Sequence, residues 1–339
     1  MRDQSRLPVA LRGLRLPLVG APMFLVSGPE LVIAQCKAGI IGAFPALNAR
    51  EAEGEPIALE RWLDRITEEL ARHDRDHPER PAAPFAVNQI VHRSNTRLER
   101  DVEICRRHRV PIWITSLGAR PEVNEAAHSC GGIVLHDVVN DRFARKAVAR
   151  GADGLIAVAA GAGGHAGAQS PFALTAEIRA WFDGPLLLSG AIATGRALLA
   201  ARALGADLGY MGTPFIATPE ARASDGYKQM VLAGGAEDIV ATDAVTGISG
   251  NFLRDSIIAA GLDPERVARS AADRPDGGPD TGLDGESRAW RDIWSAGHGI
   301  GSVQAITPVA ELVERIAREY HTAGRELAAG FAQPPASGT

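Results

Sequence analysis

The chain has 339 residues, of which 45% are hydrophobic and 23% charged, a composition typical of a globular protein with one large domain or two smaller ones. The net charge of −5, with basic residues scattered among acidic ones, argues against a general nucleic-acid binder. The N-terminal segment "MRDQSRLPVALRGLRLP" lacks the apolar core of a signal peptide, and no apolar run approaches the ~18 residues of a membrane span. We therefore expect a soluble, cytoplasmic protein that binds neither nucleic acid nor membranes.

Three cysteines, Cys36, Cys105 and Cys130, are widely separated and form no C-x-x-C pair. We expect each to be a small buried hydrophobic residue rather than a metal ligand or a nucleophile. A sparse, odd number of cysteines also fits a reducing compartment.

Short apolar segments alternate with amphipathic segments from about residue 17 to residue 214. Eight apolar segments predict strands, at 17–23, 40–46, 85–91, 112–118, 132–138, 153–159, 185–191 and 207–213. The intervening helices are expected at 27–39, 58–74, 96–109, 121–130, 141–151, 171–182 and 194–205. Ser27 is a candidate N-cap of the first helix and Gly39 its stop signal. Eight such repeats with apolar strands favour an α/β fold of the (β/α)8 TIM-barrel type over an open doubly wound sheet.

The C-terminal third breaks this alternation. Residues 223–247 predict a helix, a loop and a short strand, whereas 270–288 are rich in Gly, Pro and Asp and predict a loop. A last helix is expected over 308–330. The expected organisation is a barrel over 1–218, an insertion or cap over the barrel mouth at 219–300, a C-terminal helix packing back over 301–330, and a flexible tail at 331–339.

Catalytic residues of such barrels lie where the strands end, because the loops that follow the strands converge there. Glycines follow the last two predicted strands at Gly190, Gly195 and Gly212, with a hydroxyl at Thr213 and a helix starting near Thr194. Each glycine alone is better explained by a tight turn. Their pairing at adjacent strand ends favours a phosphate site made of backbone amides.

Two polar residues near strand ends and one methionine are further candidates. Asn88 lies within an apolar strand, where an amide either satisfies a neighbouring backbone group or faces a heteroaromatic ligand. Met23 forms either core or the floor of the same pocket. Asp137 ends the fifth strand beside His136 and is a candidate to reach the pocket.

His165 is the most distinctive candidate, because the surrounding stretch "GAGGHAGAQSPF" (161–172) is almost bare of side chains. Glycines let a flat ligand approach the backbone, and an imidazole can act as acid, base or hydrogen-bond donor near neutral pH. The alternative is a structural loop histidine. No histidine spacing indicates a metal site. Trp294 and His298, in "IWSAGHGIGS" (293–302), are secondary candidates.

Together these motifs resemble the nitronate monooxygenase family, once called 2-nitropropane dioxygenases, which are FMN-dependent (β/α)8-barrel enzymes. The similarity covers "PLVGAPM", "FAVNQ", "GADGLIAVAAGAGGHAG", "LLLSGAIATGRALLAARALGADLGYMGTPFIAT" and "WSAGHGIG". The resemblance implies an FMN site whose flavin ring is lined by Ala21, Pro22 and Met23. It makes His165 the active-site histidine beside the flavin.

The remaining FMN contacts that the resemblance implies come from four strand ends. They are a hydrogen bond from Asn88 to the isoalloxazine, a close approach of Gly163 and Gly164, and a ribityl-phosphate site at Ser189, Gly190, Ala191, Gly212 and Thr213. Asp137 joins the cofactor-binding candidates at a position where other members carry lysine. Many members also carry glutamine in place of Val158 and a Glu-Ala pair in place of Gly161-Ala162.

The resemblance implies FMN-dependent oxidation of alkyl nitronates or nitroalkanes by O2 to carbonyl compounds and nitrite. The first alternative is an NAD(P)H-dependent flavin reductase of quinones or enoyl thioesters. The second is a phosphosugar- or nucleotide-binding barrel without flavin, which shares the phosphate loops but does not need Asn88 or the bare loop around His165. The sequence leaves open whether NAD(P)H is a cosubstrate and whether the chain forms a homodimer.

Overall fold

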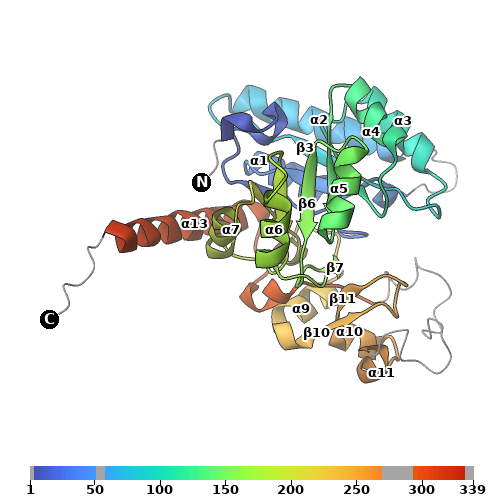
Figure 1. Ribbon diagram of the computed structural model, residues 1–339, viewed down its shortest axis with the longest axis vertical. Helices are drawn as coiled ribbons and strands as arrows, with labels where there is room; N and C mark the ends of the chain where they lie inside the picture. Colours follow the sequence, from blue (N-terminus) through green and yellow to red (C-terminus); the bar gives the residue numbers. More distant parts are fainter. Residues whose placement is uncertain (1–3, 51–57, 269–292, 333–339) are drawn as a thin grey trace.

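The computed structural model describes residues 4–50, 58–268 and 293–332 (Figure 1). Eight parallel strands form one sheet in the order β1-β9-β8-β6-β5-β4-β3-β2. Their bounds are Leu18–Gly20 (β1), Gly42–Pro45 (β2), Phe85–Ile90 (β3), Ile112–Ser116 (β4), Ile133–Val138 (β5), Gly154–Val158 (β6), Leu186–Ser189 (β8) and Leu208–Met211 (β9). A bridge from Val19 to Ile41 joins β1 to β2, and the Gly20 amide donates to the Ile41 carbonyl at 2.8 Å. The sheet therefore closes into the predicted (β/α)8 barrel.

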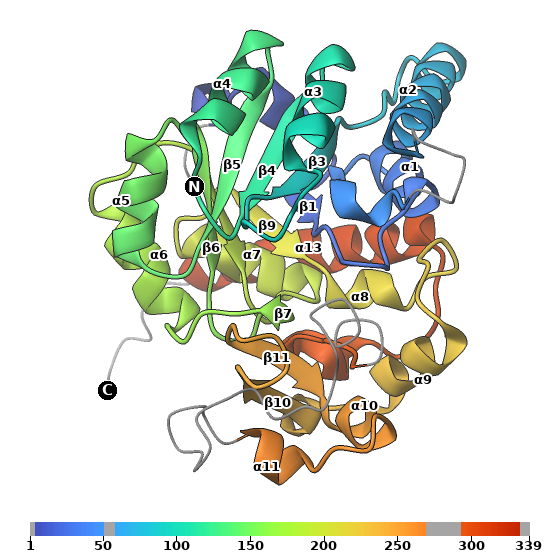
Figure 2. The ribbon, with the colours of Figure 1, turned by 90° about the vertical axis from the view of Figure 1, so that its right-hand side faces the viewer.

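Helices follow the strands and cover the outside of the barrel (Figure 2). They are α1 (Pro29–Lys37), α2 (Ala58–Asp76), α3 (Leu98–Arg107), α4 (Pro121–Ser129), α5 (Asp141–Ala149), α6 (Pro171–Arg179) and α7 (Gly195–Ala203). Helical spacing predicted α2 correctly, because Leu59, Leu63, Ile66 and Leu70 form its buried stripe. The side chains of Asn140, Ser170 and Thr194 cap α5, α6 and α7.

The predicted cap of α1 was wrong. Gly28 is the N-cap residue, and the Ser27 hydroxyl instead accepts a hydrogen bond from the Met23 amide at 2.9 Å. The chain turns sharply between β1 and α1, and this bond stabilises that turn. Gly39 does follow the end of α1, with a φ of +86°, as a C-terminal glycine should.

The residues after β9 form a short helix and then a small α/β unit. The elements are α8 (Thr213–Ile216), α9 (Asp225–Ala233), the 3-10 turn η4 (Ala236–Asp238), β10 (Ile239–Thr242), β11 (Gly250–Leu253), α10 (Arg254–Ala259) and α11 (Pro264–Ala268). We call residues 225–268 the cap. Figure 1 shows it gathered at one end of the molecule, beyond β6. The predicted loop at 270–288 lies outside the described residues.

The chain then returns to the barrel through the 3-10 turn η6 (His298–Ser302) and ends in α13 (Val309–Ala332). α13 lies against α7 and α1, as expected of a helix that packs back on the barrel. It includes residues 331 and 332, which were predicted to begin the flexible tail; residues 333–339 lie outside the description. Within the described residues, no helix combines the length and the apolar character that a bilayer crossing requires.

The barrel interior is filled by one apolar cluster. It includes Ala43, Ile112, Leu135, Ile156, Leu187 and Leu208 from six of the strands, together with Leu7 and Leu11 from the N-terminal segment. Ala21, Val158, Ala162, Ala166 and Tyr210 belong to the same cluster. The core therefore continues up to the strand ends where the candidate site residues lie.

Candidate active site

The ends of β1 and β9 supply one wall of the site. The Ala21 amide donates to the Met211 carbonyl at 2.8 Å, which holds the segment 21–23 beside the end of β9. A methyl group added to Gly212 would lie 3.5 Å from the Met23 sulfur and 3.6 Å from the Ala21 Cβ. Ala21 and Met23, predicted to line the flavin ring, thus lie beside Gly212, predicted to bind the phosphate. Pro22 lies between Ala21 and Met23 in the chain.

The ends of β6 and β8 form the adjoining wall. The Ala191 amide donates to the Gly161 carbonyl at 3.1 Å, and the Ala159 amide donates to the Ser189 carbonyl at 2.9 Å. Gly190 has a φ of +134° and Ala191 one of +54°, which is unusual for a residue with a Cβ. Such backbone conformations concentrate at ligand-binding sites, where the surrounding structure compensates for their cost.

The segment before η6 closes this wall. The Gly297 amide donates to the Thr213 hydroxyl oxygen at 2.9 Å, and the His298 amide donates to the Gly161 carbonyl at 2.9 Å. A Cβ on Gly163 would lie 2.9 Å from the Gly297 nitrogen, so only glycine fits there. The predicted segment 293–302 therefore does reach the strand ends.

Two other sequence-based candidates near this wall contact other parts of the chain. The first amide of α7, on Gly195, donates to the Glu319 carboxylate of α13 at 2.7 Å, so this amide is already used within the protein. Trp294 stacks on Tyr227 of α9 at 5.0 Å and packs, partly buried, against the largest apolar cluster.

A chain of polar side chains crosses the ends of β3, β4 and β5. The Asn88 amide nitrogen donates to the Ser116 hydroxyl at 2.7 Å and to the Ile114 carbonyl at 3.2 Å. Ser116 in turn donates to the Asp137 carboxylate at 2.6 Å. Because the Asn88 N–H groups are used inside the protein, its carbonyl oxygen remains as an acceptor for a ligand.

Burial shifts the pKa of Asp137, at the end of this polar chain, and of the nearby Tyr210. It raises the pKa of Asp137 to about 7, although the hydrogen bond from Ser116 opposes the shift. The second carboxylate oxygen, Oδ1, is buried and has no hydrogen-bond partner among the described residues. Tyr210, at the end of β9, has a raised pKa because of burial and of the nearby Asp137 charge. Asp137 therefore exchanges its proton near neutral pH and has an oxygen left to bond a ligand.

His165 lies in a strand rather than in the bare loop that was predicted. Gly164–His165 form β7, which pairs with β11 so that His165 lies opposite Gly250 (Figure 2). The Asn251 side chain donates to the Ala162 carbonyl at 2.6 Å, and the Ala166 amide donates to the Ser249 carbonyl at 3.1 Å. Burial lowers the pKa of His165 to about 4, so the imidazole is neutral at pH 7.

The sequence-based prediction of the site did not include two residues, Ser116 and Asn251. Ser116 could have been noticed as a polar residue at the end of an apolar strand, the same signal that identified Asn88. Asn251 carries no local signal, because its role depends on pairing with a segment 89 positions earlier.

The remaining titratable candidates lie in the core. His136 is buried with its Nδ1 atom 2.5 Å from the Thr115 hydroxyl, and burial lowers its pKa to about 4. Cys36 and Cys105 are buried and Cys130 is half-buried; burial raises the pKa of Cys36 to about 12. Within the described ranges, no three His, Cys, Asp or Glu side chains gather closely enough to hold a metal ion.

Comparison with known proteins gives consistent results. A nitronate monooxygenase of Paraburkholderia phytofirmans is 26% identical, over 96% of this chain and 99% of its own length. A 5-hydroxy-7a-methyl-1-oxo-octahydro-indene-4-carboxyl-CoA dehydrogenase of Rhodococcus jostii is 27% identical over 73% of this chain and 65% of its own length. The structure of FabK from Thermotoga maritima shares the fold with a TM-score of 0.73 at 24% identity, covering 95% of this chain and 97% of its own.

A family profile extends this result to most of the chain. The profile described as "Nitronate monooxygenase" matches residues 7–319, which include the barrel strands, the cap and the first part of α13. The matched region contains every residue placed at the strand ends above. The chain is an oxidoreductase that belongs to the nitronate monooxygenase family.

Proposed function

We propose that the strand ends bind FMN. The walls at Ala21, Met23, Gly212, Gly161 and Ala191 present small or apolar groups, which suit the flat face of an isoalloxazine ring. The buried Asp137 Oδ1 and the Asn88 carbonyl oxygen supply polar atoms at its edge. The Ala191 amide is taken by the Gly161 carbonyl, so the proposed phosphate ligands are the backbone amides of Gly190 and Gly212 and the Thr213 hydroxyl, beside Ser189 and Ala191.

The proposed reaction is oxidation of alkyl nitronates or nitroalkanes by O2 to carbonyl compounds and nitrite. FMN supplies the capacity to accept electrons from the substrate and to deliver them to oxygen. The protein residues position the substrate and move its proton. A neutral His165 can remove the α-proton of a nitroalkane, or donate a hydrogen bond to a nitronate oxygen.

The observation that carries this proposal is the placement of His165. The strand that carries His165, β7, pairs with β11 and follows directly after Gly163. Gly163 packs against Gly297, whose amide donates to Thr213 of the proposed phosphate site. A base or donor on this strand is therefore fixed relative to the proposed flavin site. Fixed placement of this kind is what a proton-transfer group requires.

We expect His165→Asn to retain bound flavin and to lose most turnover. General-base catalysis contributes about 10²- to 10⁴-fold, so neutral nitroalkane turnover should fall by that factor. If His165 is only a hydrogen-bond donor, turnover of preformed nitronate falls equally; if it is the base, nitronate turnover is retained. Steady-state oxygen consumption with both substrate forms measures this.

His321→Asn, at an exposed position of α13, is the matched control and should behave as the unaltered protein. Unchanged turnover of both substrate forms in His165→Asn would contradict the assigned role. Loss of bound flavin would instead show that His165 contributes to cofactor binding.

A second candidate function is an NAD(P)H-dependent reductase of quinones or enoyl thioesters on the same barrel. It is favoured by the relative named as a carboxyl-CoA dehydrogenase and by the apolar Val158 in place of the glutamine of many family members. Rapid bleaching of the flavin by NADH without oxygen would favour the reductase. Inertness to NADH together with bleaching by a nitronate would favour the oxygenase.

A further inference from the structure

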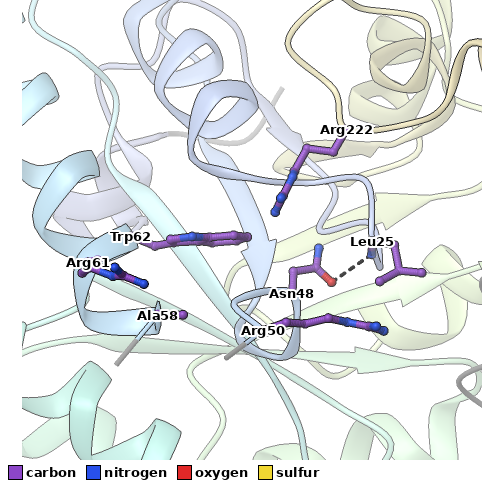
Figure 3. A pocket seen from close by; sticks show the side chains of 7 residues that line it. All are labelled: Leu25, Asn48, Arg50, Ala58, Arg61, Trp62 and Arg222. Carbon is purple, nitrogen blue, oxygen red and sulfur yellow. Dashed lines mark hydrogen bonds between the residues drawn. The ribbon is translucent and has the colours of Figure 1, made fainter. Parts of the chain in front are cut away.

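A cavity of about 420 Å³ beside the ends of β1 and β2 is lined by three arginines (Figure 3). Arg50 follows the 3-10 turn η3 (Ala46–Asn48), Arg61 lies on α2, and Arg222 precedes α9. None of the described lining residues is acidic. An adjoining cavity of about 430 Å³ shares Trp62 and Arg222 with the first. Both volumes fall within the range of small-molecule sites.

Two of the guanidinium groups are within ion-pair distance of no carboxylate in the described part of the chain. Among the described residues, neither Arg50 nor Arg222 forms an ion pair; Arg50 lies over the Phe24 ring at 5.8 Å, and Arg222 over the Trp62 ring at 5.2 Å. In the adjoining cavity, Glu30 pairs with Arg65 at 2.6 Å and also interacts electrostatically with Arg222. The first cavity therefore carries positive charge and unused N–H donors, which bind phosphate oxygens well.

Trp62 adds a flat aromatic surface to this charge. Its ring packs against the buried Phe44 at 5.5 Å, which fixes the indole on α2. In Figure 3, Arg222 extends from across the cavity toward the space between Trp62 and Asn48. An indole ring and a guanidinium group are both surfaces on which a purine base stacks.

The cavity shares a wall with the candidate active site. The Asn48 side chain accepts from the Leu25 amide at 2.9 Å and donates to the carbonyls of Met23 at 2.9 Å and Ser27 at 2.8 Å. Met23 in turn lies against Gly212 in the proposed flavin site. A ligand in the cavity is therefore separated from the strand ends by one turn of chain.

We propose that this cavity binds the phosphorylated adenosine end of a nucleotide-bearing cosubstrate, with Arg50 and Arg222 on the phosphates and the base against Trp62. The proposal deepens the second candidate function, the reductase, and rests on it, since it names the class of molecule whose reactive end would extend to the flavin site. The adenosine phosphate is common to dinucleotides and to CoA thioesters. The position of a third phosphate distinguishes these two sources.

The test is calorimetric titration of the full chain with four probes, namely ADP, adenosine 2′,5′-bisphosphate, adenosine 3′,5′-bisphosphate and inorganic pyrophosphate. We expect an adenosine probe to bind, and Arg50→Gln or Arg222→Gln to weaken it about tenfold or more. Arg75→Gln, an exposed arginine of the same helix α2 outside the cavity, is the control and should change nothing. Trp62→Phe should weaken the adenosine probes but not pyrophosphate.

Preference for the 2′-phosphate indicates a phosphorylated dinucleotide, for the 3′-phosphate a CoA thioester, and for ADP an unphosphorylated dinucleotide; each supports the proposal. No binding, equal binding by the arginine variants, or equal binding of pyrophosphate and adenosine probes overturns it. The segment 51–57, outside the described residues, contains Glu51, Glu53 and Glu55. Binding that appears only after all three are changed to glutamine would show that the chain's own carboxylates take the arginines, and would also overturn it.

Titration does not require turnover or flavin chemistry. The visible spectrum of the same samples reports the proposed function separately. A flavin-containing enzyme that binds no probe contradicts only the cavity proposal, whereas a colourless protein that binds adenosine bisphosphate contradicts only the flavin proposal.

Discussion

Burial shifts two titratable side chains of the site toward their neutral forms. His165 is a neutral imidazole at pH 7, because burial lowers its pKa to about 4. Asp137, with its pKa raised to about 7 by burial, is divided between acid and carboxylate at neutrality. The site can therefore accept a proton at His165 and either donate or accept a hydrogen bond at Asp137. A cationic imidazole is not available near pH 7 to stabilise a nitronate by charge.

Asp137→Asn should change the pH dependence of stability. An unfolded Asp ionises near its ordinary pKa of 3.8, whereas the folded group does so at about 7, so wild-type stability is lost as pH rises between these values. The variant cannot ionise there, and we expect it to gain about 2–4 kcal/mol relative to wild type between pH 4 and pH 8. Thermal unfolding of the cofactor-free protein at both pH values measures this. An equal difference at the two pH values would contradict the assigned protonation.

The residues of the polar chain were only partly predictable. Asn88 and Asp137 were identifiable because a polar residue in an apolar strand needs an explanation. Their connection through Ser116 was not, since it depends on the register of β3, β4 and β5 across the barrel. Likewise, the sequence allowed Asn88 to donate to a ligand, whereas the structure commits both N–H groups to protein acceptors.

At the scale of elements, the cap contributes directly to the active site. β7 pairs with the edge strand β11 of the cap hairpin β10–β11, and the Asn251 side chain donates a hydrogen bond to the Ala162 carbonyl. Periodicity could not predict β7, because it is two residues long and begins with glycine. The pairing explains how a glycine-rich segment can hold His165 in one place.

Asn251→Ala should disturb the position of His165 without removing a group that touches substrate. The loss of the hydrogen bond to Ala162 should cost about 1–3 kcal/mol of stability and lower turnover about 10- to 100-fold. Flavin absorbance and oxygen consumption of the same sample separate the two effects. Asn124→Ala removes a comparable buried bond to the Arg150 carbonyl, at the end of α5, and should reduce stability alone. Equal loss of turnover in both variants would argue against a positioning role for Asn251.

The junction of α7 and α13 offers a second test at this scale. A Cβ on Gly195 would lie 2.2 Å from both the Ile316 carbonyl oxygen and the Tyr320 nitrogen, so Gly195→Ala must displace α13. We expect a loss of about 1–3 kcal/mol in the free energy of unfolding. Gly324→Ala, within α13 and with no neighbouring atom within 4 Å, should instead stabilise by about 0.5–1 kcal/mol. Chemical denaturation would show a contradiction if the two variants behaved alike.

For the molecule as a whole, the alternation of apolar and amphipathic segments was sufficient to predict the barrel. Each of the eight strands is buried and each is followed by a helix, so the local pattern and the fold agree. The arrangement of the C-terminal third was less accessible, because its contacts join distant segments such as Thr213 with Gly297 and Gly195 with Glu319. The division into barrel, cap and returning helix as separate domains stays a prediction.

The central claim is that the strand ends bind a flavin that nitronates reduce. The most direct measurement is the visible spectrum of the purified protein, recorded before and after addition of a nitronate without oxygen. We predict the absorbance of an oxidised flavin, which bleaches on adding nitronate and returns on admitting O2. A colourless protein, or a flavin that nitronate leaves unchanged while NADH bleaches it, would contradict the account.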